Sequence, residues 1–374
     1  MQKFRKIPTF IFLHILWILI LVSPGGVAQN SIPGRTIRKP VDTIGFATHA
    51  WQMDSVMARI VRLGKNIAPE SIPDKPSGSG KYWKAAICPH DDYVYAGWLY
   101  PEALKNIHAK TVILFGVAHK AKRFNLENRL IFDSFKEWQE PYGNVKVSPI
   151  REEIMKNLPE GAYLVHDSMQ IVEHSVEAII PFLQYTKRDL RIVCILVPYM
   201  SFDRMNELSG QLAMSIKKVM KTDGLEWGKD VAMVMSTDAV HYGDEEWGGQ
   251  NYAQYGCDST GFNQAIAHEK EIIDNCLAGI LLPDRIKRFV DYTVKPEDYR
   301  SYKWTWCGRY SVPFGLLTIL KIQAMISKNA LTGVPAGYGT SLNKPGIEVT
   351  DLKMGRTAIA TLHHWVGYAG IGYY

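Results

Sequence analysis

Four short, almost wholly apolar runs are the feature of this chain that most constrains its fold. They lie at 84–88, 111–116, 192–197 and 231–236, bounded by Pro, Gly or small polar residues. Runs of this length without polar alternation are typical of strands buried on both faces of a parallel sheet. Helical patterns lie between them. The alternation predicts an α/β fold, a three-layer sandwich with a central, largely parallel or mixed sheet and helices on both faces.

The remaining patterns complete this layout. A further strand is expected at 161–165, and 332–374 alternates Gly, Thr, Tyr and apolar residues, notably in 356–365 and 366–374. That alternation predicts two or three antiparallel strands at the end of the chain. No break predicts a second domain, so 44–374 is expected to be a single α/β domain. Helices are expected near 96–108, 174–186, 202–221, 258–277, 283–291 and 312–327.

The segment 1–28 predicts a signal peptide rather than part of the fold. Three basic residues precede an apolar stretch at 10–22, and small residues stand before Ala28. The stretch is shorter than the roughly 18 apolar residues of a membrane-spanning helix. We expect cleavage after Ala28 and an exported protein, periplasmic or extracellular; the alternative is an uncleaved N-terminal anchor. Residues 29–43 are expected to follow as an extended leader.

Charge argues against a nucleic-acid partner. The full chain has a formal net charge of +6, and three of its basic residues lie in the signal segment. A mature chain near +3, without a block of Lys and Arg, is not expected to bind polyanions. Beyond the signal segment, no membrane contact is predicted.

Five cysteines are spread along the chain without regular spacing. Export would allow disulfides, and Cys257 and Cys276 could form one. Cys88 and Cys194 lie within apolar runs, where a buried free thiol is the ordinary interpretation.

Three histidines stand at the downstream ends of apolar runs: His90, His119 and His241. In open α/β sheets, groups just past the carboxyl ends of the strands converge on one crevice, where ligands bind. We therefore expect a transition-metal site there, whereas the alternative for each histidine alone is an ordinary loop or core residue. Three acidic residues close by in sequence could be ligands or orient the imidazoles. They are Asp91, Asp92 and Asp238.

Glu173-His174-Ser175 is expected to begin a helix. An acidic residue and a polar cap at that position have a purely local explanation. The functional alternative places His174 in the same crevice as a proton donor or acceptor.

Cys307 is followed by Gly308 and Arg309, and a helix is expected from 312 onward. A cysteine near a helix N-terminus and near an Arg is expected to have a lowered pKa. Its thiolate could then be a soft metal ligand or a nucleophile. The alternative is a capping turn with a buried thiol.

Taken together, five ordered segments resemble the Memo family, which includes bacterial proteins named AmmeMemoRadiSam system protein B. The resemblance covers about 44–374, and five ordered matches are specific where any one alone would be weak. The family segments are A-P-H-A-G-Y, G-P-S-H-H, E-H-S-I-E, S-S-D-x-x-H and C-G-R-H-P. They correspond in order to 88–93, 116–120, 173–177, 236–241 and 307–310.

The resemblance implies an α/β fold similar to that of class III extradiol dioxygenases. It also implies a metal site made of His90, His119 and Cys307, with copper or iron as the associated metals. Some family members are regarded instead as non-enzymatic binding proteins. The residues that would line the pocket and carry acid–base or orienting roles are His241, His174 and Asp238. The residues expected to surround the ligands are Asp91, Asp92 and Arg309.

The chain departs from the family pattern at three points. Asp91-Asp92 stands where the family has Ala-Gly, Lys120 replaces the second His of the paired motif, and Tyr310 replaces the His after Cys-Gly-Arg. These changes spare the three implied ligands and alter their surroundings. Export would also separate the chain from a cytosolic radical-SAM partner, so that partnership is doubtful.

Three functions follow as hypotheses. The first is a metal-dependent oxidoreductase resembling extradiol dioxygenases that acts on a small or aromatic substrate. A thiolate in place of a carboxylate changes the softness of the site, so ring cleavage itself does not follow. The second is a non-enzymatic protein that binds a metal or a peptide, and the third is a zinc hydrolase. Export favours copper or zinc over ferrous iron, which oxidises readily outside the cytosol.

Overall fold

The computed structural model of the chain describes residues 29–30, 32, 34, 36–66 and 82–374. The predicted signal peptide at 1–28 lies outside these residues. Within the described ranges, no helix is both long and apolar enough to cross a membrane.

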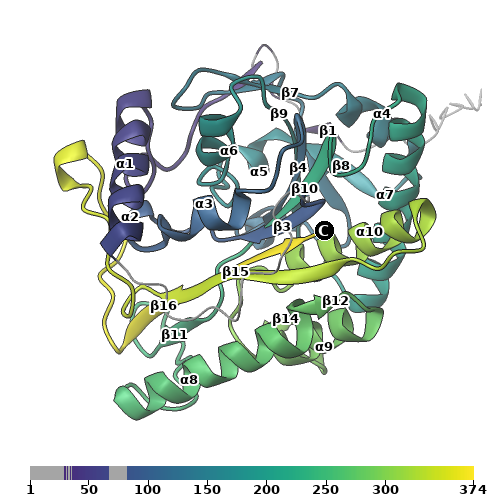
Figure 1. Cartoon of the computed structure of the whole chain (residues 1–374). Coiled ribbons are helices and arrows are strands. Elements are labelled where there is room, and N and C mark those ends of the chain that lie inside the picture. Colours follow the sequence, from purple (N-terminus) through teal and green to yellow (C-terminus); the bar gives the residue numbers. More distant parts are fainter. Residues whose placement is uncertain (1–28, 31, 33, 35, 67–81) are drawn as a thin grey trace, which may run out of the picture.

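Four parallel strands form the centre of a mixed sheet (Figure 1). In order across the sheet they are β9 (Arg191–Val197), β4 (Thr111–Val117), β10 (Val231–Ser236) and β3 (Ala85–Cys88). These strands are the four apolar runs. Along β4, Val112 and Leu114 enter one layer of the core, while Ile113 and Phe115 enter the other. Both faces are covered, which explains the missing polar alternation, and the predicted α/β fold is confirmed.

Antiparallel strands extend the sheet beyond β3. β16 (His364–Tyr373) pairs antiparallel with β3, and β15 (Thr332–Thr340) pairs antiparallel with β16. The short β12 (Gly279–Ile280) ends this side of the sheet. The predicted antiparallel C-terminal strands are therefore confirmed, although 356–363 forms a loop rather than a strand.

The opposite side of the sheet includes the leader. β5 (Leu130–Phe132) pairs antiparallel with β9, and β8 (Tyr163–His166) continues from it, close to the strand predicted at 161–165. Two short leader strands, β1 (Gln29–Asn30) and β2 (Ile37–Arg38), pair with β8 and with β6 (Glu137–Trp138). The leader is thus extended but joined to the sheet.

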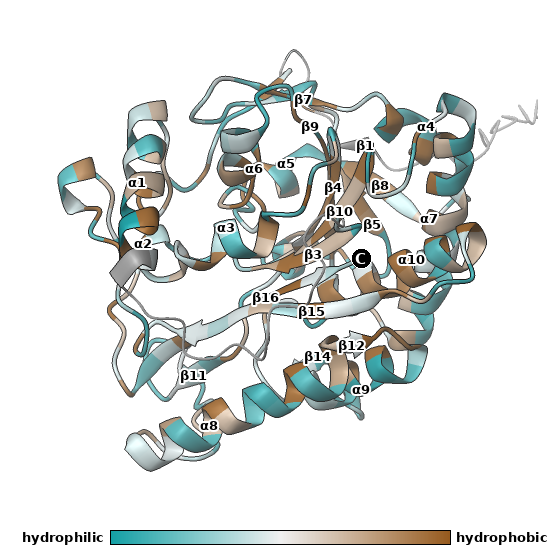
Figure 2. Cartoon of the chain, viewed as in Figure 1, coloured by the Kyte–Doolittle hydropathy of each residue, from teal (hydrophilic) through white to brown (hydrophobic). Residues whose placement is uncertain are grey.

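Helices cover both faces of the sheet (Figures 1 and 2). In Figure 2 the brown, hydrophobic strands lie between helices whose outer surfaces carry teal, hydrophilic residues. The helices on one face are α1 (Ala50–Asn66), α2 (Tyr93–Ala96), α3 (Leu99–Leu104) and α6 (Ile180–Thr186). Those on the other are α4 (Ile150–Asn157), α7 (Phe202–Asp223), α8 (Ser259–Ile272), α9 (Pro283–Thr293) and α10 (Ser311–Ile326).

Two predicted helices are shorter than expected. The helix predicted at 96–108 is divided into α2 and α3, and α3 ends at Leu104. The helix predicted at 174–186 begins only at Ile180, after a series of turns. A helix beginning at 174 would need an amide proton at residue 181 to continue its bonds, and Pro181 has none. Glu173-His174-Ser175 therefore lies in turns, and its predicted place at a helix start is wrong.

All five cysteines are free, so the disulfide considered between Cys257 and Cys276 is not formed. The two lie beyond opposite ends of α8, whose 14 residues span roughly 20 Å.

The remaining elements are β7 (Val145–Val147), β11 (His241–Gly243), β13 (Val294–Lys295), β14 (Asp298–Tyr302), α5 (Asp167–Gln170), the 3-10 turns η1 (Ala121–Phe124) and η3 (Thr350–Leu352), and the π-helical η2 (Ile273–Leu277) that continues α8.

Candidate metal centre

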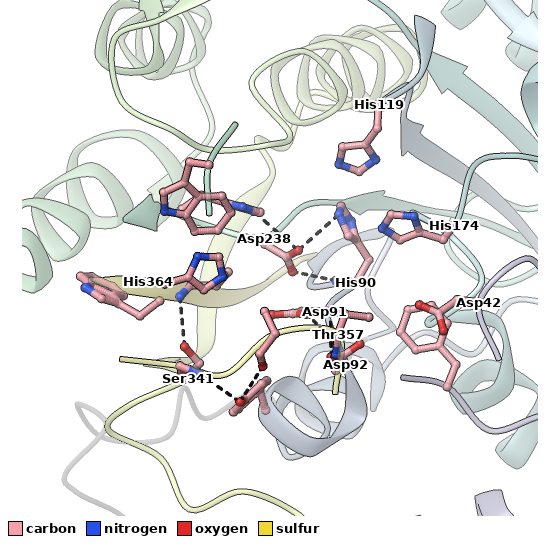
Figure 3. Close-up of a pocket in the computed structure, with 18 of the residues that line it drawn as sticks. Asp42, His90, Asp91, Asp92, His119, His174, Asp238, Ser341, Thr357 and His364 are labelled. Atoms are coloured by element: carbon pink, nitrogen blue, oxygen red, sulfur yellow. Dashed lines mark hydrogen bonds and ion pairs between the residues drawn. The ribbon is translucent and has the colours of Figure 1, made fainter. Parts of the chain in front are cut away.

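Three adjacent central strands bring the predicted site residues together. β4, β10 and β3 are neighbours in the sheet and run parallel. His119 follows the end of β4, Asp238 follows the end of β10, and His90 follows the end of β3. The carboxyl ends of parallel strands meet at one edge of a sheet, so these side chains converge there (Figure 3).

His90, His119 and Cys307 form a group with the spacing of metal ligands. Their donor atoms all lie within 4.8 Å of one another. Sγ of Cys307 is 3.5 Å from Nε2 of His90, and the two imidazole rings are nearly perpendicular, with centroids 5.2 Å apart. Cys307 comes from the turn before α10, so a segment far away in sequence closes the group. The arrangement can hold one cation.

Each of the two imidazoles is fixed through its Nδ1 atom. Nδ1 of His90 lies 2.6 Å from Oγ of Ser236, and that hydroxyl donates its proton to the carbonyl of Ser175. The hydroxyl must therefore accept from Nδ1–H, which leaves the lone pair of His90 on Nε2. Nδ1 of His119 lies 2.8 Å from a carboxylate oxygen of Glu173, which leaves its Nε2 free in the same way. Both Nε2 atoms are thus available to a cation.

Ser236 and Glu173 carry this orienting role, which the sequence analysis did not assign to them. Ser236 is the last residue of β10, and Glu173 lies in the turns before α6. Both belong to the segments quoted for the family resemblance, so their positions close to His174 and Asp238, two predicted pocket residues, were the available signal.

Asp238 lies beside His90 and Cys307, as predicted. Its Oδ1 accepts the amide of His90 at 2.9 Å, and its Oδ2 is 3.3 Å from Nε2 of the same residue. Burial raises the pKa of Asp238 to about 7 against the opposing effect of backbone hydrogen bonds. The carboxyl group is therefore poised to gain or lose a proton near neutral pH.

His241 and His174 also line the pocket. Nε2 of His241 is buried without a hydrogen-bond partner, 3.9 Å from Oδ2 of Asp238. The His174 ring stacks on that of His119, with centroids 5.1 Å apart. Burial and the neighbouring His119 lower the pKa of His241 to about 3 and that of His174 to about 4. Both imidazoles are neutral at pH 7 and can accept protons.

The predicted lowering of the Cys307 pKa is wrong. Burial and the nearby Asp238 carboxylate raise the pKa of this thiol well above its ordinary value. Arg309 gives no compensation, because its guanidinium packs 3.4 Å from the centre of the Tyr302 ring and donates to the carbonyl of Arg300. A bound cation would deprotonate the thiol directly.

Arg309, Cys307 and His119 line another, smaller cavity of about 70 Å³. Nε of Arg309 is buried there without a hydrogen-bond partner. Arg309 therefore lies beside the ligands as expected. It contributes a cavity wall and a buried positive charge, and it does not bond to Cys307.

Asp91 and Asp92 line the main pocket but do not bond to an imidazole. Asp91 accepts the hydroxyl proton of Tyr368 at 2.6 Å. Asp92 accepts the amide and the hydroxyl of Thr357 at 2.5 and 3.0 Å. Burial and a neighbouring carboxylate raise the pKa of each to about 7. The contacts of Asp91 and Asp92 therefore hold the pocket wall together. They do not orient the histidines, which was one of the roles considered from the sequence.

The main pocket is a cavity of about 380 Å³ in front of the ligand group (Figure 3). Its far wall, opposite His174, is aromatic: the Trp247 and His364 rings stack with centroids 4.0 Å apart. Lys120 adds a single positive charge at the lining. Lining residues that the sequence analysis did not identify include Asp42, Trp247, Ser341, Thr357 and His364. Asp42, Trp247 and Thr357 come from loops, whereas Ser341 directly follows β15 and His364 begins β16. None of the five follows an apolar parallel strand, which is the signal that marked His90 and His119.

Comparison with known proteins gives one family. A family model described as Memo-like protein matches residues 52–331, a range that contains every predicted site residue. A MEMO1 family protein from Thermotoga petrophila is 30% identical over 192 residues, covering 50% of this chain and 64% of the relative. MEMO1 family proteins from Pyrococcus horikoshii and Methanothermobacter thermautotrophicus are 28% and 24% identical, covering 44% and 48% of this chain. The matched parts make up 55% and 61% of these two relatives, so this chain spans less than two thirds of each.

Proposed function

The chain belongs to the Memo-like protein family, and from that premise we propose that its strand-end site binds one transition-metal ion. The ion would serve redox chemistry on a small or aromatic substrate. His90 and His119 would bind it through Nε2, and Cys307 through Sγ. The observation that carries the proposal is that these donor atoms lie within 4.8 Å of one another while both Nδ1 atoms are already bonded.

The donor set fits copper or iron, with zinc as a further candidate. A thiolate with two imidazoles is a soft-to-borderline set, which favours copper and zinc over harder ions. A copper or iron ion would supply one-electron chemistry. Its charge would also offset that of the thiolate and of Asp238 in this buried site, where the Asp238 carboxylate lies near enough to raise the pKa of Cys307.

Residues of the chain would handle protons around the ion. His241 Nε2 has no hydrogen-bond partner and lies at the lining of the main pocket, so it can accept a hydrogen bond from a bound substrate. Asp238, whose pKa burial raises to about 7, is the better proton acceptor near neutral pH. His174, a second neutral imidazole stacked on His119, can also accept a hydrogen bond.

A non-enzymatic binding protein is the second candidate, and the aromatic wall favours it. Trp247 and His364 form a stacked surface on which a planar group can lie, and Tyr95 and Phe46 line the same cavity. A peptide with an aromatic side chain, or a free aromatic ligand, would fit these features without turnover.

Location and partners are proposed from the sequence alone. We propose an exported, periplasmic or extracellular protein that acts on a small-molecule or peptide ligand. Neither nucleic acid nor a cytosolic radical-SAM protein is part of this proposal.

Metal content of the purified protein tests the site. The experiment compares the wild type with His90→Ala, His119→Ala and Cys307→Ala by elemental analysis. The matched controls are His108→Ala, which changes a histidine outside the pocket, and Cys276→Ala, which removes a buried thiol outside it. We expect stoichiometric copper or iron in the wild type and both controls, and loss in the three site variants. Unchanged metal in those variants would overturn the ligand assignment.

Oxygen uptake then separates the candidate functions. The metal-loaded protein is mixed with a catechol in an oxygen electrode. Consumption of oxygen that Cys307→Ala abolishes supports redox turnover. A protein that contains zinc and hydrolyses esters without oxygen uptake would be a hydrolase instead. Binding of the catechol without either reaction would leave the binding protein as the function.

A further inference from the structure

A second group of metal-binding side chains lies outside the pocket. Asp244, Cys257 and His363 come from three separate segments, and their donor atoms all lie within 4.8 Å of one another. Nδ1 of His363 is 2.7 Å from Oδ1 of Asp244. The His363 and Asp244 side chains are 49% and 38% exposed, so an ion from solvent can reach them.

The backbone already holds two of these residues in place. The amides of Asp244 and Glu245 both donate to the carbonyl of His363, at 3.1 and 3.2 Å. Gly243 permits this approach, because a Cβ atom there would lie 1.9 Å from the same carbonyl oxygen. Its φ of +134° is also unfavourable for other residues. Asp244 and His363 are thus fixed against each other before any ion binds.

The third residue is anchored by a buried tyrosine. The hydroxyl of Tyr242 donates to the carbonyl of Gly256 at 3.1 Å and accepts the amide of Tyr255 at 2.8 Å. Cys257 follows directly, and α8 begins two residues later. The thiol therefore comes from a restrained turn, and its sulfur lies within 4.8 Å of the donor atoms of Asp244 and His363. All three donors are prearranged.

We propose that Asp244, Cys257 and His363 form a second, solvent-accessible metal site that takes zinc. Thiolate, imidazole and carboxylate are the three protein ligands that zinc prefers, and a site with three of them keeps its fourth position for water. Zinc would replace the protons that now join the three side chains. The site shares no residue with the His90, His119 and Cys307 group, so this inference does not rest on the proposed function.

Zinc at this site would also connect two segments of the main pocket wall. Trp247 lies three residues after Asp244, and His364 directly follows His363. The Trp247 and His364 rings stack on each other in the cavity wall. An ion that ties Asp244 to His363 would restrain both, so we expect slower amide hydrogen exchange in 244–257 when zinc is bound.

Metal titration tests the site. Metal-stripped protein is titrated with Zn²⁺ by calorimetry and with Co²⁺ by absorption, since a cobalt–thiolate bond gives a charge-transfer band. The variants are Cys257→Ser and His363→Gln. The matched control is His268→Gln, because His268 also pairs with a carboxylate, that of Glu271 at 3.4 Å. We expect affinity at the outer site to fall at least about tenfold in both variants, since even orienting partners of a ligand are worth that much. The control should bind as the wild type does.

A Cys307→Ala variant separates the two sites. The outer-site signal should persist in it and vanish when Cys257→Ser is added. If Cys257→Ser leaves the spectrum unchanged while Cys307→Ala alters it, the outer site of Asp244, Cys257 and His363 is contradicted and the inner site stands. If Cys307→Ala leaves the spectrum unchanged while Cys257→Ser alters it, the proposed function is contradicted and the outer site stands. Circular dichroism of each variant verifies folding. Identical cobalt spectra for the wild type and Cys257→Ser would overturn the proposal.

Discussion

One carboxylate fixes both the ring and the backbone of His119. Oε1 of Glu173 lies 2.8 Å from Nδ1 of His119, and Oε2 accepts the His119 amide at 2.7 Å. Oε1 also accepts the amide of Ser175. Although burial opposes it, the charge and hydrogen bond of His119 lower the pKa of Glu173 to about 2. Glu173 is therefore ionised at neutral pH, and the His119 ring is held with Nε2 toward His90 and Cys307.

Glu173→Gln is predicted to weaken metal binding without removing a ligand. The amide group can accept fewer hydrogen bonds than the carboxylate, so one of the three donors loses its partner and the ring is less well held. We expect metal affinity to fall about 10- to 100-fold, measured by competition with a chelator. Glu271→Gln is the control, because Glu271 pairs with His268, a histidine outside the pocket. Equal affinities in both variants would rule out an orienting role for Glu173.

Arg38→Ala is predicted to destabilise the protein strongly. The buried guanidinium pairs with Glu177 and donates to the carbonyls of Gln170 and Glu173. Removing it leaves a buried carboxylate unpaired, which costs about 3–5 kcal/mol of unfolding free energy. Because the same carbonyls shape the turn that carries Glu173, metal affinity should fall as well. Chemical denaturation and metal titration measure the two effects.

A surface ion pair provides the comparison for Arg38. Arg59 pairs with Asp351, whose side chain is 62% exposed. Arg59→Ala should therefore cost no more than about 1 kcal/mol. If both arginine variants lose equally little stability, the leader is not anchored through Arg38 as the structure indicates.

Gly308→Ala is predicted to disturb the position of Cys307. A Cβ atom at Gly308 would lie 2.3 Å from Oγ1 of Thr237, the residue between Ser236 and Asp238. The turn would have to move, at a cost of about 1–3 kcal/mol, and metal affinity should fall with it. Gly210→Ala, within α7, is the matched control, because the nearest atom to the added Cβ would be Nζ of Lys321 in α10, 3.6 Å away. That change should instead stabilise the helix by about 0.5–1 kcal/mol.

The central strands and the two histidine ligands could be predicted from the sequence because both depend on local pattern. An apolar run fixes a buried strand, and the residue two positions past its end lies at the rim of the sheet. His90 and His119 were found in this way. Cys307 could not be, since its place beside them depends on how the turn before α10 packs against β10. Its place near a helix N-terminus made Cys307 a candidate ligand, but only the family resemblance joined it to the two histidines.

The charge environment of the site was less predictable. A lowered Cys307 pKa was expected from a neighbouring Arg in sequence, but Arg309 packs on Tyr302 while Asp238 lies near the thiol. Sequence proximity does not give the direction of a side chain. The same reason explains why the sequence did not predict the cluster of Asp244, Cys257 and His363. These residues are separated in sequence and meet through the pairing of β11 with β16 and the anchoring by Tyr242.

Glu269 lies beneath the site and joins two of its segments. Its Oε1 accepts the indole protons of Trp304 and Trp306, both at 2.6 Å, and its Oε2 accepts the amide of Val240 at 3.1 Å. Trp306 precedes Cys307 in sequence, so this carboxyl group supports the turn that carries the thiol. Burial raises its pKa from the ordinary 4.5 to about 7, although the three donors oppose the shift.

This raised pKa predicts that the Glu269 contribution to stability falls as pH rises. Between pH 4.5 and about 7 the folded protein holds the Glu269 proton and the unfolded chain does not, so unfolding free energy decreases by up to about 1.4 kcal/mol per pH unit. The total is on the order of 3 kcal/mol, with no further loss above the folded pKa. Glu269→Gln cannot ionise, so its unfolding free energy should fall less steeply as pH rises. Urea denaturation of both proteins from pH 5 to 8 measures the difference, and parallel curves would show that Glu269 titrates normally.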